Sequence, residues 1–263
     1  MQLEQVTRAL NKIKSIDDLL RAASHLLVRV EPADNEWLTT RTELMSDYIA
    51  ELVFERIRTV LKARFSEKLM EDLAYPDTHS IAGSLFKHAA HFSIRKGLTL
   101  SMTPLPSGTK LDVYIPGTPV TVAKEKSRYY SLSIREKPRS QNVHADFLNL
   151  YMTPISKSQP SVDAVFISPE YITFLFQMTV SPHHPIDFRG LDTVINKLPA
   201  KAQKDIRIVF ITPAQVPLGE EFKGIQTVQS IVHPHNADTE KIKKFEGLPQ
   251  YVCQLDTNTI GWV

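Results

Sequence analysis

The sequence predicts an α/β domain over residues 78–263, in which helices flank a mixed β-sheet, preceded by an N-terminal helical region over residues 1–77. Two observations lead to this fold class. Residues 160–256 follow the order strand, strand, helix, strand, helix, strand, which is typical of a layered domain with a mixed sheet. Residues 1–77 instead repeat apolar side chains at spacings of three and four, the period of an amphipathic helix.

The composition is that of an ordinary globular protein. The 263 residues are 42% hydrophobic and 23% charged, with a net charge of +2. No run of about eighteen apolar residues occurs, so we expect a soluble protein without a membrane span. The stretch Met1-Gln-Leu-Glu-Gln-Val lacks a basic start followed by an apolar run, so we expect no signal peptide there. The single Cys253 excludes an internal disulfide and a cysteine-rich zinc site, and its apolar neighbours predict a buried thiol.

Two helices are expected in the N-terminal region. The first covers residues 2–30, within which Asp17-Asp18 starts either a new turn or a new helix, and it ends before Pro32, since proline disfavours helix in the residue that precedes it. The second runs over about residues 41–73, with Thr39 or Thr40 as its N-cap and apolar side chains on one face.

A third helix is expected after the break at Pro76. Thr78 or Ser80 caps its start, and Gly97 ends it, since glycine commonly follows the last turn of a helix. Arg95 and Lys96 lie in its last turn, where a cation suits the helix dipole. The histidine at position 91 of this helix is expected to be a packed core residue.

A β-rich insertion is expected over residues 98–140, where Gly/Pro joints separate the strand-like runs 98–102, 111–115, 120–123 and 129–134. Residues 80–140 contain ten Lys or Arg and three acids, a net charge of +7 that leaves −5 for the remainder. Such a block is either a phosphate-binding surface or a solvated, charge-rich hairpin. The residues assigned to nucleic-acid binding are Lys124, Lys126, Arg128, Arg135, Lys137 and Arg139.

The remaining elements alternate between strands and helices. The expected strands cover about residues 162–167, 172–180, 207–212 and 251–255, and the expected helices cover about residues 190–198 and 220–232. Residues 148–154 form either a further short strand or an extended lead-in. Two of these strands carry polar side chains. Asp163 opens the first, and Gln177 and Thr179 share one face of the second because side chains at i and i+2 point to the same side. The sequence therefore predicts a polar site on an apolar scaffold.

Three stretches together resemble a known family. They are Gly83-Ser-Leu-Phe-Lys-His-Ala-Ala-His-Phe-Ser-Ile-Arg-Lys-Gly, then Tyr151-Met-Thr-Pro with Val162-Asp-Ala-Val-Phe, and Phe176-Gln-Met-Thr-Val-Ser-Pro-His-His-Pro-Ile with Gly190-Leu. Over residues 79–256 the chain resembles the C-terminal nuclease-like domain of Crinkler-type and retrotransposon-hot-spot effectors, a divergent branch of the PD-(D/E)xK superfamily. The resemblance implies a restriction-endonuclease-like core, a nucleic-acid substrate and Mg²⁺ as cofactor. It also implies a secreted effector that acts in a host nucleus.

The resemblance assigns a role to each candidate residue. Asp163 matches the strand acid, and Gln177, in the acid position of (D/E)xK, joins it as a metal ligand. Thr179 stands where the lysine is expected, and Lys87 stands where a helix glutamate is expected. Lys87 is then either a migrated catalytic lysine or an ion-pair partner of Asp163. His184 either contacts a phosphate or moves a proton, or it caps the turn.

These departures weaken the expected metal site. Asp163 and Gln177 bring one formal negative charge, and a cation at Lys87 repels the ion, so we expect weak Mg²⁺ affinity. The sequence therefore favours a DNA-binding domain, with DNA rather than RNA as partner, and a degenerate active site. An active Mg²⁺-dependent endonuclease is one alternative. An effector scaffold that binds a host protein is another, since fold does not determine function.

Overall fold

The structure is a computed structural model, and it describes residues 2–15, 18, 27–32, 40–61, 64–74, 76–117, 147–154, 161–181, 185–215, 225–229 and 239–256. The chain divides into two compact units. Unit 1 comprises Met1–Ser93, Pro213–Val216 and Asp256–Val263, and unit 2 comprises Ile94–Thr212 and Pro217–Leu255. Within the described ranges, no helix has both the length and the apolar character needed to cross a membrane.

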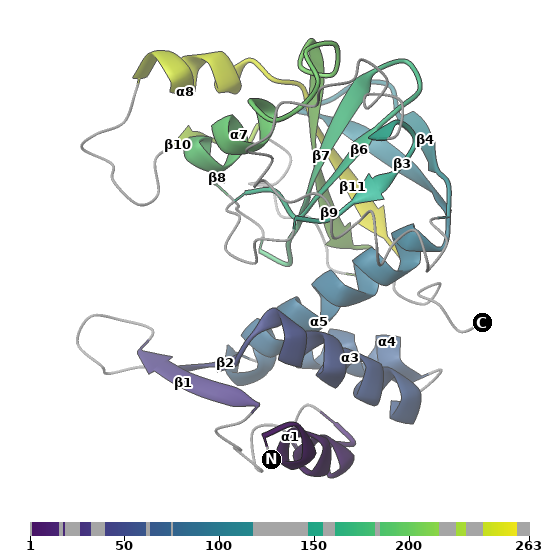
Figure 1. The fold of residues 1–263 in the computed structure, drawn as a ribbon, viewed down its shortest axis with the longest axis vertical. Helices are drawn as coiled ribbons and strands as arrows, with labels where there is room; N and C mark the ends of the chain where they lie inside the picture. Colours follow the sequence, from purple (N-terminus) through teal and green to yellow (C-terminus); the bar gives the residue numbers. More distant parts are fainter. Residues whose placement is uncertain are drawn as a thin grey trace. The chain divides into compact units, whose positions relative to one another are not determined.

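Unit 1 is built mainly from helices (Figure 1). Its elements are α1 (Gln2–Asn11), β1 (Val28–Pro32), β2 (Thr40–Leu44), α3 (Asp47–Leu61), α4 (Phe65–Leu73) and α5 (Pro76–Arg95), the last of which belongs to this unit as far as Ser93. Its core includes the fully buried Val53, Phe54 and Phe65. The rings of Phe54 and Phe65 meet edge to face, with their centroids 5.6 Å apart.

Two segments of this unit that the sequence analysis predicts as helix form antiparallel strands instead. The predictions of helix at residues 28–30 and 41–44 are wrong, because β1 and β2 pair antiparallel there, with Val28 opposite Leu44. The pairing is supported across the strands by an ion pair between Arg29 Nη2 and Glu43 Oε2 at 2.9 Å. The two runs alternate β-branched and charged residues, a period of two that favours strand once a partner is present.

The helix boundaries also differ from the prediction. The expected helix over residues 41–73 is two helices, and Ser46 rather than Thr39 or Thr40 caps the first, since its Oγ accepts the Ile49 N–H at 3.2 Å. Helix α5 begins at Pro76, earlier than the predicted caps, because proline suits the first helical position. The predicted stop at Gly97 is confirmed by its positive φ of 96°.

Unit 2 contains the α/β fold that the sequence predicts, a mixed sheet flanked by helices. Its elements are β3 (Leu98–Leu105), β4 (Leu111–Ile115), β5 (Tyr151–Met152), β6 (Ala164–Ile167), β7 (Ile172–Met178), β8 (Ile186–Asp187), α7 (Phe188–Ile195), β9 (Asp205–Pro213), β10 (Val228–Gln229), α8 (Thr239–Glu246) and β11 (Gln250–Leu255). The 7-stranded sheet has the order β4-β3-β11-β9-β7-β6-β5. Strands β6 and β7 are antiparallel, whereas β7 and β9 are parallel.

The prediction of helix over residues 220–232 is wrong where that range is described. Val228 and Gln229 form β10, which pairs parallel with β8, so that Val228 lies opposite Ile186. Val228 is also buried in the hydrophobic core of unit 2. Burial against a neighbouring strand therefore overrides the weak helical pattern of this segment.

The central sheet is buried on both faces. Val165, Leu175 and Phe210 share one core cluster with Leu191 of α7 and Phe245 of α8. Figure 1 shows α7 and α8 side by side, as their residue contacts require. On the other face, the rings of Tyr151, Phe166, Phe174 and Phe176 pack together. Continuous burial explains why β6 and β7 are nearly all apolar, and why polar residues at their ends stand out.

Candidate functional site

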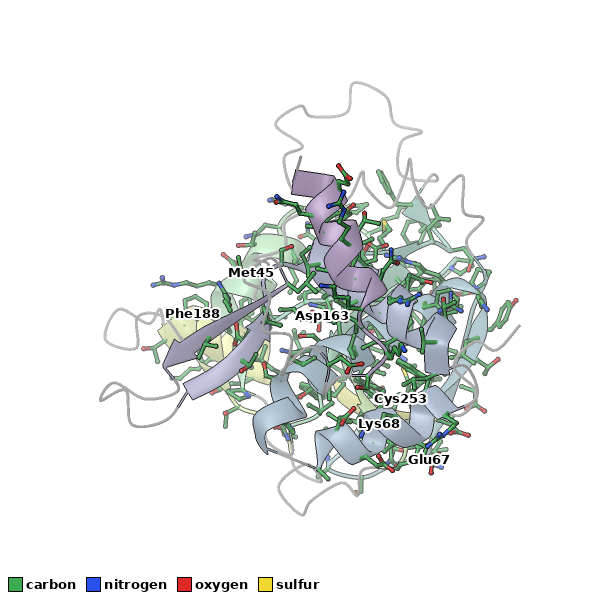
Figure 2. The ribbon with its side chains drawn as sticks, turned by 90° about the horizontal axis from the view of Figure 1, so that it is seen from below. Met45, Glu67, Lys68, Asp163, Phe188 and Cys253 are labelled. Carbon is green, nitrogen blue, oxygen red and sulfur yellow. The ribbon has the colours of Figure 1, made fainter. Side chains whose placement is uncertain are left out.

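Three of the predicted site residues meet at one end of the β6–β7 pair. Ala164 of β6 lies opposite Phe176 of β7, so Asp163, labelled in Figure 2, and Gln177 are the residues that adjoin this last pair of the register. Thr179 follows the last residue of β7, and its N–H donates to Ile211 O at 2.9 Å. The expected polar site is thus assembled from two neighbouring strands, with β9 beside them.

Asp163 is held by backbone hydrogen bonds. Its N–H donates to Phe176 O at 2.8 Å, and its Oδ2 accepts the Met178 N–H at 2.7 Å. Through these two hydrogen bonds, Asp163 attaches the residue before β6 to the backbone of β7. This half-buried group has a structural role in addition to any ligand that it binds.

Gln177 presents a buried acceptor. Its side chain is 5% exposed, and within the described residues its Oε1 has no hydrogen-bond partner. The same is true of Thr212 Oγ1, and the parallel register places Thr212 opposite Thr179. A buried acceptor without a donor costs about 1–3 kcal/mol. Water or a ligand that supplies a donor or a cation would remove this cost.

Thr179 shapes the turn after β7. Its Oγ1 accepts the Ser181 N–H at 3.0 Å, a bond that closes a local turn, and the residue is 6% exposed. In the position where the resemblance expects a lysine, the chain therefore has a buried turn-forming hydroxyl. It brings no positive charge to Asp163.

Sequence reasoning missed a second polar group at this end of the sheet. Arg95 Nη2 donates to Thr153 Oγ1 at 3.0 Å, just past the end of β5. Burial raises the pKa of Tyr151 well above its ordinary value, the charge of Arg95 lowers that pKa, and the charge of Asp163 raises it. Both charges therefore act on one buried phenol. In the sequence, Arg95 counts among the basic residues of 80–140, and its place two residues before Gly97 indicates a helix end.

The other predicted site residues fall elsewhere. Lys87 lies on α5 within unit 1, where it is half-buried, and its suggested role beside Asp163 stays a prediction. His184 lies outside the described residues. So do the six predicted nucleic-acid contacts Lys124, Lys126, Arg128, Arg135, Lys137 and Arg139. His91 is buried, as the sequence predicts for a core histidine.

The donor set fits Mg²⁺ poorly. Asp163 offers a carboxylate that already accepts a backbone N–H, and Gln177 offers a neutral amide oxygen. Mg²⁺ prefers carboxylates in a regular octahedral arrangement. Across the part of the chain that the structure describes, no three His, Cys, Asp or Glu side chains gather as metal ligands. Cys253 is buried, as expected from its apolar neighbours.

Comparisons of the chain with protein-family models, with curated proteins and with solved structures found no significant match.

Proposed function

We propose that this protein binds nucleic acid, DNA in preference to RNA, through a nuclease-like α/β unit whose active site is degenerate. The observation that carries the proposal is the position of Asp163 directly before β6, where Ala164 pairs with Phe176, the neighbour of Gln177 in antiparallel β7, with β9 parallel to β7. A restriction-endonuclease-like core would carry its strand acid and its (D/E)xK pair at these places. By the same resemblance, the protein would be a secreted effector that acts in a host nucleus.

The charge distribution supports phosphate binding. Residues 80–140 carry ten basic and three acidic side chains, whereas the whole chain has a net charge of only +2. Contacts between Lys or Arg and phosphates supply most of the affinity of sequence-independent binding. Such contacts also make the affinity fall steeply as salt rises.

The site itself favours binding over cleavage. Hydrolysis of a phosphodiester by this chemistry needs a metal held by carboxylates and a cation or base that activates water. Gln177 supplies no carboxylate and Thr179 supplies no cation or base, and the Thr179 hydroxyl oxygen already accepts the Ser181 N–H. The Asp163 carboxylate already accepts a backbone N–H, so one of its oxygens is engaged in the fold. We therefore derive no hydrolytic step for this site.

Binding and cleavage are separated by one pair of assays. Fluorescence anisotropy with labelled double-stranded DNA, single-stranded DNA and RNA measures affinity between 50 and 300 mM salt, about the range over which phosphate contacts are lost. Cleavage of the same substrates is followed with Mg²⁺ or Mn²⁺. We expect salt-sensitive binding that persists in EDTA, and no cleavage.

Variants identify the source of any activity. Metal-dependent cleavage that disappears in Asp163→Ala would establish an active nuclease at this site and overturn the degenerate one. Cleavage that survives Asp163→Ala would show that the site is wrongly assigned. Gain of cleavage in Lys87→Glu, which restores the expected helix acid, would identify a nuclease inactivated by that lysine. Failure to bind any of the three nucleic acids would favour a scaffold that binds a host protein.

A further inference from the structure

Arg95 carries a positive charge that no carboxylate neutralises in the described part of the chain. The residue lies in the last turn of α5 and is half-buried. Its one hydrogen bond with the described residues is the bond from Nη2 to Thr153 Oγ1, a neutral hydroxyl. Its Nε is buried and has no partner among them. A partly buried cation with an unused donor is costly unless an anion pairs with it.

The bond to Thr153 places this cation at the same end of the sheet as Asp163. Tyr151 lies opposite Phe166 and Met152 opposite Val165, so the register brings Thr153 opposite Ala164, the neighbour of Asp163. Adjacent strands are about 4.8 Å apart. The guanidinium is therefore held beside the ends of β5 and β6, in the neighbourhood of Asp163.

The neighbouring groups do not neutralise Arg95. Tyr151 is buried, and its raised pKa keeps the phenol protonated and neutral at physiological pH. The Asp163 carboxylate accepts the Met178 N–H. Thr179, where the resemblance expects a cation, has none to offer. Among the described residues, Arg95 is thus a positive group that unit 2 places at this end of the sheet.

We propose that Arg95 is a phosphate-binding residue at this end of the sheet, and that Thr153 positions its guanidinium. The donors that Thr153 leaves unused bind the oxygens of a nucleic-acid backbone phosphate. Planar guanidinium groups favour this contact because two parallel N–H donors match two phosphate oxygens. This inference rests on the proposed function, and it adds a phosphate contact to the six predicted within residues 124–139.

Nucleic-acid binding by Arg95 variants tests the inference. With a fluorescein-labelled 20-mer duplex as probe, Arg95→Gln should weaken binding about tenfold and reduce the slope of log K against log salt by about one. Arg95→Lys keeps the charge but loses the paired donors, so its salt slope should stay near wild type while its affinity falls. Thr153→Val, which removes the acceptor at nearly constant volume, should weaken binding less than Arg95→Gln.

Lys204→Gln is the matched control, since it removes one exposed cation from the same unit. We expect it to change affinity less than twofold. Circular dichroism shows whether each variant is folded. If Arg95→Gln is folded and binds the duplex as tightly as wild type, with the same salt slope, the inference is wrong.

A second readout does not depend on nucleic-acid binding. Inorganic phosphate should raise the Tm of wild type and of Lys204→Gln, and it should raise the Tm of Arg95→Gln and of Arg95→Lys less or not at all. If wild type binds no nucleic acid but shows this pattern, the proposed function fails while the anion site at Arg95 stands. Equal phosphate stabilisation of all four proteins would overturn the site itself.

Discussion

Asp163 combines a place in the candidate site with a measurable role in the fold. Its Oδ2 accepts the Met178 N–H at 2.7 Å, so this backbone donor depends on one side chain. Hydrogen bonds to charged groups contribute about 1.5–3 kcal/mol, more than those between neutral partners. Stability and ligand binding must therefore be separated in any experiment on this residue.

Asp163→Ala should lower the free energy of unfolding by about 1–3 kcal/mol, since it leaves the Met178 N–H without its acceptor. Asp163→Asn keeps an acceptor oxygen and should lose less. Urea denaturation of the two variants and of wild type measures both effects. Equal stability of all three would show that this bond contributes nothing to the fold.

Cys253, labelled in Figure 2, introduces a pH dependence. Burial raises the pKa of its thiol from 9.0 to about 12, so the folded protein keeps a proton that the unfolded chain loses. The contribution of the thiol to stability is complete below about pH 9. It declines as pH rises toward 12, by at most about 1.4 kcal/mol per pH unit.

We therefore expect the free energy of unfolding to fall more steeply between about pH 9 and 11 in wild type than in Cys253→Ala. Denaturant titrations at each pH measure the two slopes. Tyr151, whose pKa is also raised by burial, contributes equally to both proteins. Identical slopes would contradict the proposed burial of the thiol.

Between elements, the junction of α5 with β3 depends on one glycine. Gly97 has φ of 96°, a region that other residues rarely adopt. A Cβ at this position would lie 2.9 Å from Gly117 N and 3.3 Å from Gly117 Cα, so backbone would have to move to admit it. The helix turn that this junction ends carries Arg95, the residue proposed to bind phosphate.

Gly97→Ala should destabilise the protein by more than about 1 kcal/mol, since it combines an unfavourable φ with a backbone clash. Gly247→Ala is the matched control, because a Cβ there meets nothing within 4 Å. Thermal and urea unfolding compare the two variants. A Gly97→Ala protein as stable as the control would refute the strained junction.

For the molecule as a whole, the uneven charge distribution sets the expected partner. Residues 80–140 carry a net charge of +7 within a chain of net charge +2. A field of this kind attracts polyanions and accelerates their association. The proposed function therefore depends on where the charges lie in the chain rather than on their total.

Reversal of three of these charges should weaken DNA binding at least tenfold and flatten its salt dependence. The triple variant carries Lys124→Glu, Lys126→Glu and Arg128→Glu. A second triple variant, which reverses three exposed charges elsewhere, changes the net charge equally and serves as the control. It carries Lys12→Glu, Lys14→Glu and Lys243→Glu. Anisotropy titrations against the same duplex compare the two. Undiminished binding by the first triple variant would rule out the basic segment as the DNA contact.

Local pattern was sufficient to predict the core strands of unit 2 and the place of its polar residues. Apolar runs and the turn residues between them predict β6 and β7, and a period of two predicts that Gln177 and Thr179 share a face. Local pattern failed at β1, β2 and β10. Short strands of this kind form only against a partner, so their own residues do not determine their structure.

The sequence by itself thus determined the α/β class, the apolar strands and the candidate residues Asp163, Gln177 and Thr179. Only the tertiary structure decided which of them lie together, and it added Arg95, whose partner Thr153 is 58 residues away along the chain. Strand order and contacts of this kind depend on packing between distant segments. Residue spacing does not encode that packing, because periodicity records which face of an element is buried and not what covers it.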